Sequence, residues 1–185
     1  MVGVPGNRSV TARWWSRARG LPTGTYQSWL ESARTHPGRQ TRILAWARTP
    51  SGVCIGSPSM ISYGNESAWR HVGWHQIEQG GWNAETQKLS WSTYDGSREF
   101  IDLVEPGRMP ELFRERVSAS IVAERFVPIA GERGVTVSGR RDLAEASPAI
   151  TWHQTLGRGL SWNSDEVREA ANVALAELQA EYGML

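Results

Sequence analysis

The sequence predicts an α+β protein in which a curved antiparallel sheet, or roll, is accompanied by three helices. Short apolar segments separated by turn residues run from residue 42 to 103 and are typical of an antiparallel meander. Apolar residues at helical spacing precede, interrupt and follow the expected strands. The chain of 185 residues has the length of one domain with its own core.

The first expected element is a short N-terminal helix that follows Thr25, a residue type favoured at helix caps. One face of this helix collects its apolar side chains, namely Tyr26, Trp29, Leu30 and Ala33. The helix should stop at His36-Pro37-Gly38. Residues 43–47 then alternate as in a strand, and the turn residues 49–52 lead into a second strand over 53–61.

The segment from Trp69 to Trp82 is long for one straight strand. Gly73 and the pair Gly80-Gly81 therefore indicate bends or bulges, which predict a strongly curved sheet.

A hairpin follows, in which residues 89–93 alternate cleanly and Asp95-Gly96 provides the two-residue turn into a strand over 100–103. Pro106-Gly107 ends the meander. The next segment predicts a middle amphipathic helix packed across the sheet. Its apolar residues at three-and-four spacing are Met109, Leu112, Phe113, Val117 and Ile121.

Three more short strands are expected around residues 127–129, 135–137 and 150–152, where they would continue the sheet. Asn163 and Glu166 then form a capping-box-like start for a C-terminal helix. The apolar stripe of this helix consists of Val167, Ala170, Ala171, Ala174, Leu175, Leu178 and Tyr182.

The composition limits the classes of function. A net charge of +1 is too balanced for a nucleic-acid footprint over the whole protein, so any such interaction must be local. No apolar run approaches the roughly 20 residues of a membrane-spanning helix, and residues 1–20 lack the apolar stretch of a secretory signal. We therefore expect a soluble, cytoplasmic protein, with the single cysteine, Cys54, as a packed thiol.

The N-terminal segment has the least ordinary composition. We divide the chain into a basic arm, residues 1–24, and a single α+β domain, residues 25–185. Arginine can pair with phosphates or carboxylates, and adjacent indoles can stack on bases or fill a pocket of a partner. The candidate partner-binding residues are Arg13, Trp14, Trp15, Arg17 and Arg19. The alternative interpretation is that both tryptophans cover the protein's own sheet while the arginines stay solvated.

A family resemblance supports the expected fold. The stretch Trp74-His75-Gln76-Ile77, then Trp82, the strand over 88–94, Asp95-Gly96, the strand over 100–103 and the amphipathic helix resemble bacterial pleckstrin-homology-like (PH-like) domains. The similarity covers about residues 42–123 and implies a curved sheet closed by a helix. The helix start, residues 111–117, is also similar to uncharacterised actinobacterial proteins of this layout.

Members of that family that bind phosphoinositides use clustered lysines and arginines around the first hairpin. Here the turn of residues 49–52 contains no basic residue, and only Arg48 is adjacent. Phosphoinositide binding is therefore disfavoured.

Other constellations favour structural interpretations. His71 and His75 would lie roughly 13 Å apart along a strand at about 3.3 Å per residue, too far to share one zinc ion, so we expect no metal site. The run Gly157-Arg158-Gly159 is better explained as a turn than as a dinucleotide fingerprint, because Trp162 replaces the third glycine. No cofactor is expected, and Arg140-Arg141 is interpreted as a solvated pair at a strand end.

These observations predict a non-enzymatic binding or scaffolding module that recognises a protein partner or itself through the Arg/Trp arm. One version docks the arm on the acidic C-terminal helix of a second copy, since residues 164–185 carry five acids against Arg168. One alternative is binding of nucleic acid or an anionic surface through the same arm, weakening with salt. Another is an enzyme whose site combines residues distant in sequence.

Overall fold

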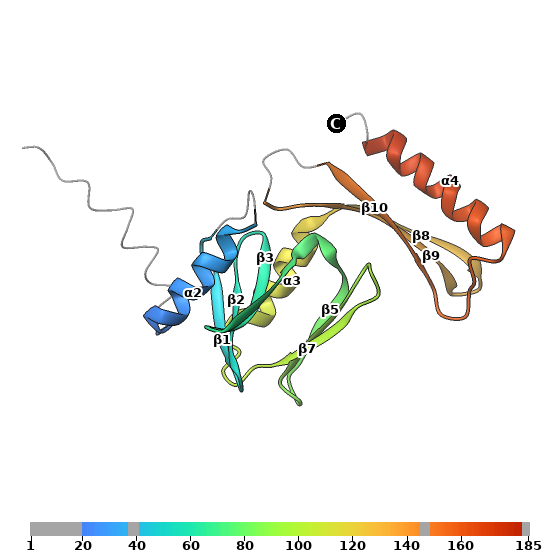
Figure 1. Cartoon of the computed structure of the whole chain (residues 1–185). Helices are drawn as coiled ribbons and strands as arrows, with labels where there is room; N and C mark the ends of the chain where they lie inside the picture. The colour runs from blue at the N-terminus through green and yellow to red at the C-terminus, as the bar shows by residue number, and fades with distance from the viewer. Residues whose placement is uncertain (1–19, 37–40, 145–148, 183–185) are drawn as a thin grey trace, which may run out of the picture.

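The computed structural model describes residues 20–36, 41–144 and 149–182. In this part of the chain the protein is α+β, with three antiparallel sheets and three α-helices (Figure 1). The predicted fold class is confirmed at this level. The expected arm boundary, between residues 24 and 25, falls in the first turn of a helix, and the single-domain organisation remains a prediction.

The first sheet has the strand order β1-β2-β3-β4. Its strands are β1 Ala45–Thr49, β2 Gly52–Gly56, β3 Met60–Asn65 and β4 Ala68–Gly73. The strand expected over 53–61 is wrong, because the chain reverses between β2 and β3. The Ser57 backbone N–H donates to the Met60 carbonyl (2.9 Å), and the Ser57 hydroxyl accepts from the Met60 N–H (3.2 Å). Pro58 within this turn has no N–H for a ladder.

Helix α2, Thr23–Arg34, covers one side of this sheet (Figure 1). Its predicted apolar face is confirmed: Trp29 and Ala33 are fully buried, packed in one cluster with residues of β2 and β3. The predicted cap is wrong, since Thr25 lies inside the helix. Its hydroxyl donates instead to the Glu66 carboxylate at 2.9 Å and ties the helix to the β3–β4 turn.

The second sheet has the order β5-β6-β7, with β5 Ile77–Asn83, β6 Lys88–Thr93 and β7 Arg98–Asp102. The bend predicted at Gly73 is confirmed, because β4 ends there and a 3-10 turn, η1 Trp74–Gln76, leads into β5. The hairpin predicted at Asp95-Gly96 is also confirmed, but its turn is longer than the two residues expected, because the Thr93 N–H donates to the Ser97 carbonyl (3.0 Å) and leaves Tyr94, Asp95 and Gly96 between them. Gly96 has φ of +87°, the left-handed region that glycine adopts without strain.

Helix α3, Met109–Ser120, packs against both of these sheets, as predicted. Phe113 and Leu112 are buried, and a side chain at Gly56 of β2 would come within 2.4 Å of Leu112, so the helix approaches that strand closely. Ile121, expected in the helix, is instead the first residue of the next strand. The core around α3 consists of Ala45, Ala47, Cys54, Ile61, Trp74, Ile77, Leu89, Trp91, Ile101, Leu103, Met109, Leu112 and Phe113.

The expectation that the last strands continue the same sheet is wrong. They form a third sheet of order β10-β9-β8, with β8 Ile121–Ala130, β9 Arg133–Arg141 and β10 Ile150–Leu156 (Figure 1). Strand β8 follows α3 without a loop, and it pairs with β9 instead of with a strand of the first two sheets.

Helix α4, Asp165–Tyr182, covers one face of this third sheet (Figure 1). Its apolar stripe is confirmed in a second core of Ala123, Val135, Val137, Val167, Ala171, Ala174 and Leu178. The expected cap at Asn163 is displaced by one residue, because Ser164 directly precedes the helix and its carbonyl accepts from the Arg168 N–H. None of the helices in the described ranges is long and apolar enough to span a bilayer.

Candidate functional site

A groove of about 500 Å³ runs between β5 and the exposed flank of α3. We call it the β5–α3 groove. Five consecutive residues of β5, Glu78–Trp82, form one wall. The other lining residues come from α3, β8 and β9 and are Pro110, Glu111, Phe113, Arg114, Val117, Ser118, Ile121, Glu124 and Arg140.

The chemistry of this groove is apolar inside and charged at its rim. Phe113 is buried in the core cluster, and the half-buried Trp82, Val117 and Ile121 provide apolar surface. Glu111, Glu124 and Arg114 are exposed charged residues at the rim. Glu111 also lies 3.7 Å from Arg108. Within the described residues, β5 has a ladder partner, β6, on one side only. A strand edge of this kind can accept a further extended segment through its backbone groups.

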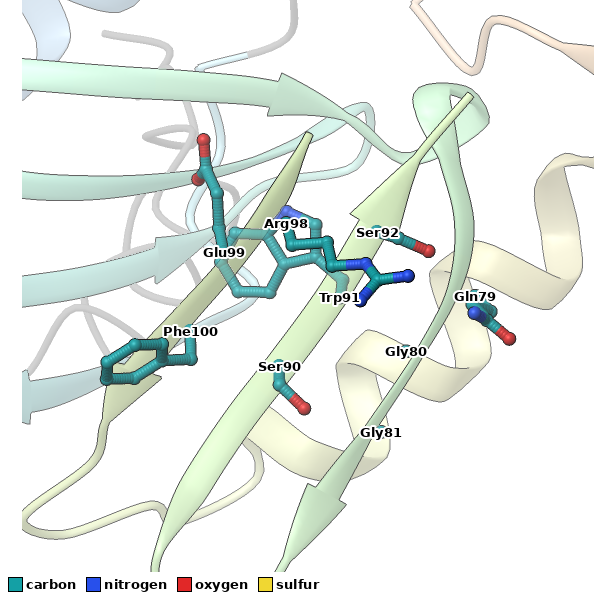
Figure 2. A pocket seen from close by; sticks show the side chains of 9 residues that line it. All are labelled: Gln79, Gly80, Gly81, Ser90, Trp91, Ser92, Arg98, Glu99 and Phe100. Carbon is teal, nitrogen blue, oxygen red and sulfur yellow. The ribbon is translucent and has the colours of Figure 1, made fainter. Parts of the chain in front are cut away.

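A second hollow of about 660 Å³ lies over the sheet β5-β6-β7 (Figure 2). We call it the outer hollow, because most of its side chains point away from the core around α3, whereas Trp91 and Glu99 lie on the core face. Its lining residues are Gln79, Gly80, Gly81, Ser90, Trp91, Ser92, Arg98, Glu99 and Phe100. Phe100 is 60% exposed, unusual for a phenylalanine on a strand.

The third sheet contacts the second sheet and α3 through a buried arginine, contrary to the expected solvated pair. Arg140 is only 2% exposed. Its Nε donates to the Tyr94 hydroxyl at 2.9 Å, and its Nη1 donates to the Ser120 hydroxyl at 3.0 Å. Nη1 and Nη2 also donate to the carbonyls of Val117 and Glu78, at 3.2 and 3.3 Å. We call this set of contacts the Arg140 junction.

Two further side chains complete the polar part of the junction. The Glu78 carboxylate accepts hydrogen bonds from Thr155 of β10 at 2.8 Å and from Ser92 of β6 at 3.3 Å. His75 Nδ1 lies 3.4 Å from an oxygen of Asp142. Glu78 and Arg140 are thus engaged by partners within the chain, an arrangement that stabilises the contact between the sheets.

The Tyr94 and His153 rings stack at 3.6 Å between centroids and 7° between planes. Burial lowers the pKa of His153, the electrostatic influence of Arg140 and His75 lowers it further, and Glu78 opposes them. The neutral form of His153 is therefore the form that the junction favours.

This shift predicts a loss of stability at mildly acidic pH. Because the His153 pKa is lower in the folded chain than its ordinary 6.5, the unfolded chain takes up the proton first. Above about pH 6.5 the titration of His153 does not change the free energy of unfolding. As the pH falls below that value, protonation of His153 in the unfolded chain lowers the free energy of unfolding. Between about pH 7.5 and about pH 5.5, the urea midpoint should fall more for the wild type than for His153→Phe, which keeps a stacking ring. Equal falls would contradict this role.

The five candidate residues of the arm, Arg13, Trp14, Trp15, Arg17 and Arg19, lie outside the described residues. The acidic helix to which one version docks them is described. Three of its acids already have a partner. Arg125 of β8 contacts Glu177 at 2.6 Å and Glu181 at 3.4 Å, and Arg168 pairs with Asp165.

The other residues singled out from the sequence have contacts that explain them as structural residues. Cys54 is fully buried in the core and burial raises the pKa of its thiol, so the packed-thiol prediction is confirmed. The His71 ring bridges the hydroxyls of Ser32 and Ser62, at 2.8 Å each, and His75 faces Asp142 instead. Gly157 and Gly159 lie in the turn that precedes α4, and Gly159 has φ of +81°.

Sequence reasoning missed the groove, the outer hollow and the Arg140 junction. A signal for the junction was present in β9, where Thr136, Ser138 and Arg140 alternate with the valines that face α4. A second signal was Gly80-Gly81, which removes two side chains from the wall of the groove.

Comparison of the chain with protein-family models, with curated proteins and with solved structures finds no match.

Proposed function

We propose that this protein is a non-enzymatic binding module with a PH-like first part, which recognises a protein partner or a second copy of itself. In this proposal an Arg/Trp segment of the kind found at residues 13–19 is the ligand, and the β5–α3 groove receives it. The observation that carries the proposal is the groove itself: the one-sided edge of β5 faces an apolar floor, with the carboxylates Glu111 and Glu124 and the cation Arg114 at the rim.

The chemistry of the two surfaces is complementary. Indoles such as those of Trp14 and Trp15 would bury apolar area against the half-buried Trp82, Val117 and Ile121. Buried aromatic anchors dominate binding energy at interfaces. Arginines of the same segment would face the rim carboxylates, which steers association and sets its orientation. Backbone hydrogen bonds to β5 would add affinity that is independent of side chains.

The PH-like part of the proposal has support from the order of elements. Four antiparallel strands are followed by three more and then by α3, which packs against both sheets. The β1–β2 turn carries no basic residue, so the ligand we propose is a protein segment and not an inositol phosphate.

Fluorescence anisotropy of a labelled peptide of residues 8–20, titrated with the full-length protein, tests the proposal. We expect saturable binding that Trp14→Ala and Trp15→Ala in the peptide weaken at least about tenfold. Ser118→Arg, which places a cation on an exposed wall residue, should abolish binding.

A matched pair on one helix provides the control. Glu111→Gln removes a rim charge and should weaken the peptide about two- to fivefold, the effect of one exposed ion pair. Glu115→Gln, at another exposed residue of α3 that lies outside the groove, should leave binding unchanged. The proposal is contradicted if light scattering finds only monomer and deletion of residues 1–20 alters no binding partner.

A further inference from the structure

The outer hollow is built from the side of the sheet that faces away from α3. In β6, Leu89 and Trp91 are buried in the core, so Ser90 between them and Ser92 after them point to the opposite face. The register pairs Ser90 with Phe100 and Ser92 with Arg98, which places these two β7 side chains on the same face (Figure 2).

The floor of the hollow is nearly free of bulky side chains. Gly81 pairs with Ser90, and a Cβ added at Gly81 would meet no atom within 4 Å. Between Phe100 of β7 and Gln79 of β5, this face of the sheet carries only the short Ser90 side chain, since Gly81 has none (Figure 2). A flat ring can therefore approach the sheet beside Phe100.

The groups around this floor form an aromatic and cationic set. Lys88 Nζ lies 4.5 Å from the centre of the Phe100 ring and 3.8 Å from a carboxylate oxygen of Asp102. Arg98 extends across the hollow (Figure 2). The Glu99 carboxylate, in contrast, forms an ion pair with Arg70 at 2.9 Å and points away from Phe100 (Figure 2).

We propose that the outer hollow binds a short single-stranded segment of nucleic acid. One base stacks on Phe100, neighbouring phosphates pair with Arg98 and Lys88, and the hydroxyl and amide of Ser90 and Gln79 contact base edges. An exposed aromatic ring on a sheet with cations beside it is the arrangement that single strands use, since every base offers a face for stacking. The positive charge of Arg98 and Lys88 complements a phosphate backbone.

This inference goes beyond the proposed function. The two sites share Gln79, Gly80 and Gly81 of β5, but the side chains substituted in the two tests differ. The protein segment is expected at the edge of β5 and on α3, whereas the single strand lies over β6 and β7. A negative result at one site does not contradict the proposal for the other, because Glu111 and Ser118 do not line the outer hollow.

Anisotropy of labelled oligothymidylate and oligouridylate, each of about ten nucleotides, with the full-length protein provides the test. We expect binding at about 50 mM salt that weakens towards about 200 mM, and the two oligomers distinguish DNA from RNA. Phe100→Ala should weaken binding at least about fivefold, and Arg98→Gln should reduce its salt dependence.

The matched controls are Phe126→Ala and Arg114→Gln. Phe126 is a 52% exposed phenylalanine on β8, and Arg114 is an exposed arginine on α3. Neither variant should change oligonucleotide affinity by more than about twofold. The inference is overturned if the wild type binds neither oligomer at low salt, if a duplex binds equally well, or if Phe100→Ala binds like the wild type, which would place any binding on the arm.

Discussion

Replacing Arg140 with methionine is expected to destabilise the protein by about 3–5 kcal/mol. The guanidinium is 2% exposed, and methionine would replace its volume without its donors. The hydroxyls of Tyr94 and Ser120 and the carbonyls of Val117 and Glu78 would lose a charged hydrogen-bond partner together. Leaving a buried acceptor without a partner costs more free energy than the hydrogen bond itself contributed to stability.

Urea unfolding followed by tryptophan fluorescence measures this loss. The neighbouring Arg141 is exposed and donates a single hydrogen bond, to the Ala119 carbonyl, so Arg141→Met should change stability by less than about 1 kcal/mol. Arg140→Lys keeps the charge but not the planar fork, and an intermediate value is expected. Similar values for Arg140→Met and Arg141→Met would show that the junction is not a principal stabilising contact.

Replacing Trp74 with alanine is expected to destabilise the protein by about 3–5 kcal/mol through loss of packing. Trp74 is fully buried where β4 turns into β5, and its ring meets Phe113 of α3 edge-on at 5.9 Å. Its indole N–H donates to the Ser57 carbonyl at 3.0 Å. The residue therefore holds both sheets and the helix together.

The same unfolding measurement applies, with near-ultraviolet circular dichroism to report on packing. Trp74→Phe keeps most of the apolar contact and loses the hydrogen bond to Ser57, so about 1–3 kcal/mol is expected. Trp162→Ala removes a tryptophan that is 37% exposed and should alter stability by less than about 1 kcal/mol. A loss below about 1 kcal/mol for Trp74→Ala would contradict the structural importance of this residue.

Local elements with strong turn chemistry or periodicity could be predicted. The Asp95-Gly96 hairpin formed because a glycine with positive φ suits a tight turn between alternating strands. The stripes of α3 and α4 are buried as their spacing required. The break between β2 and β3 was missed, since Ser57-Pro58-Ser59 lies within an otherwise strand-like run and its turn depends on a side-chain hydrogen bond to Met60.

Contacts between elements could not be predicted from local patterns. The division into three sheets depends on where β8 goes after α3, and the local pattern of β8 was interpreted as a continuation of the meander. The sequence around Arg140 is typical of a solvated strand end. Only the approach of Tyr94 and Ser120 from distant segments makes Arg140 a buried donor. The outer hollow likewise depends on register across three strands.

Hydrogen exchange gives the sharpest test of whether an extended segment adds to the edge of β5. The full-length chain carrying Trp14→Ala and Trp15→Ala is compared with and without the peptide of residues 8–20, so that the protein's own arm does not compete. We expect slower exchange over residues 78–82 and along the groove side of α3, with α4 unchanged. Protection confined to α4, with exchange over residues 78–82 unaltered, would rule out strand addition at β5.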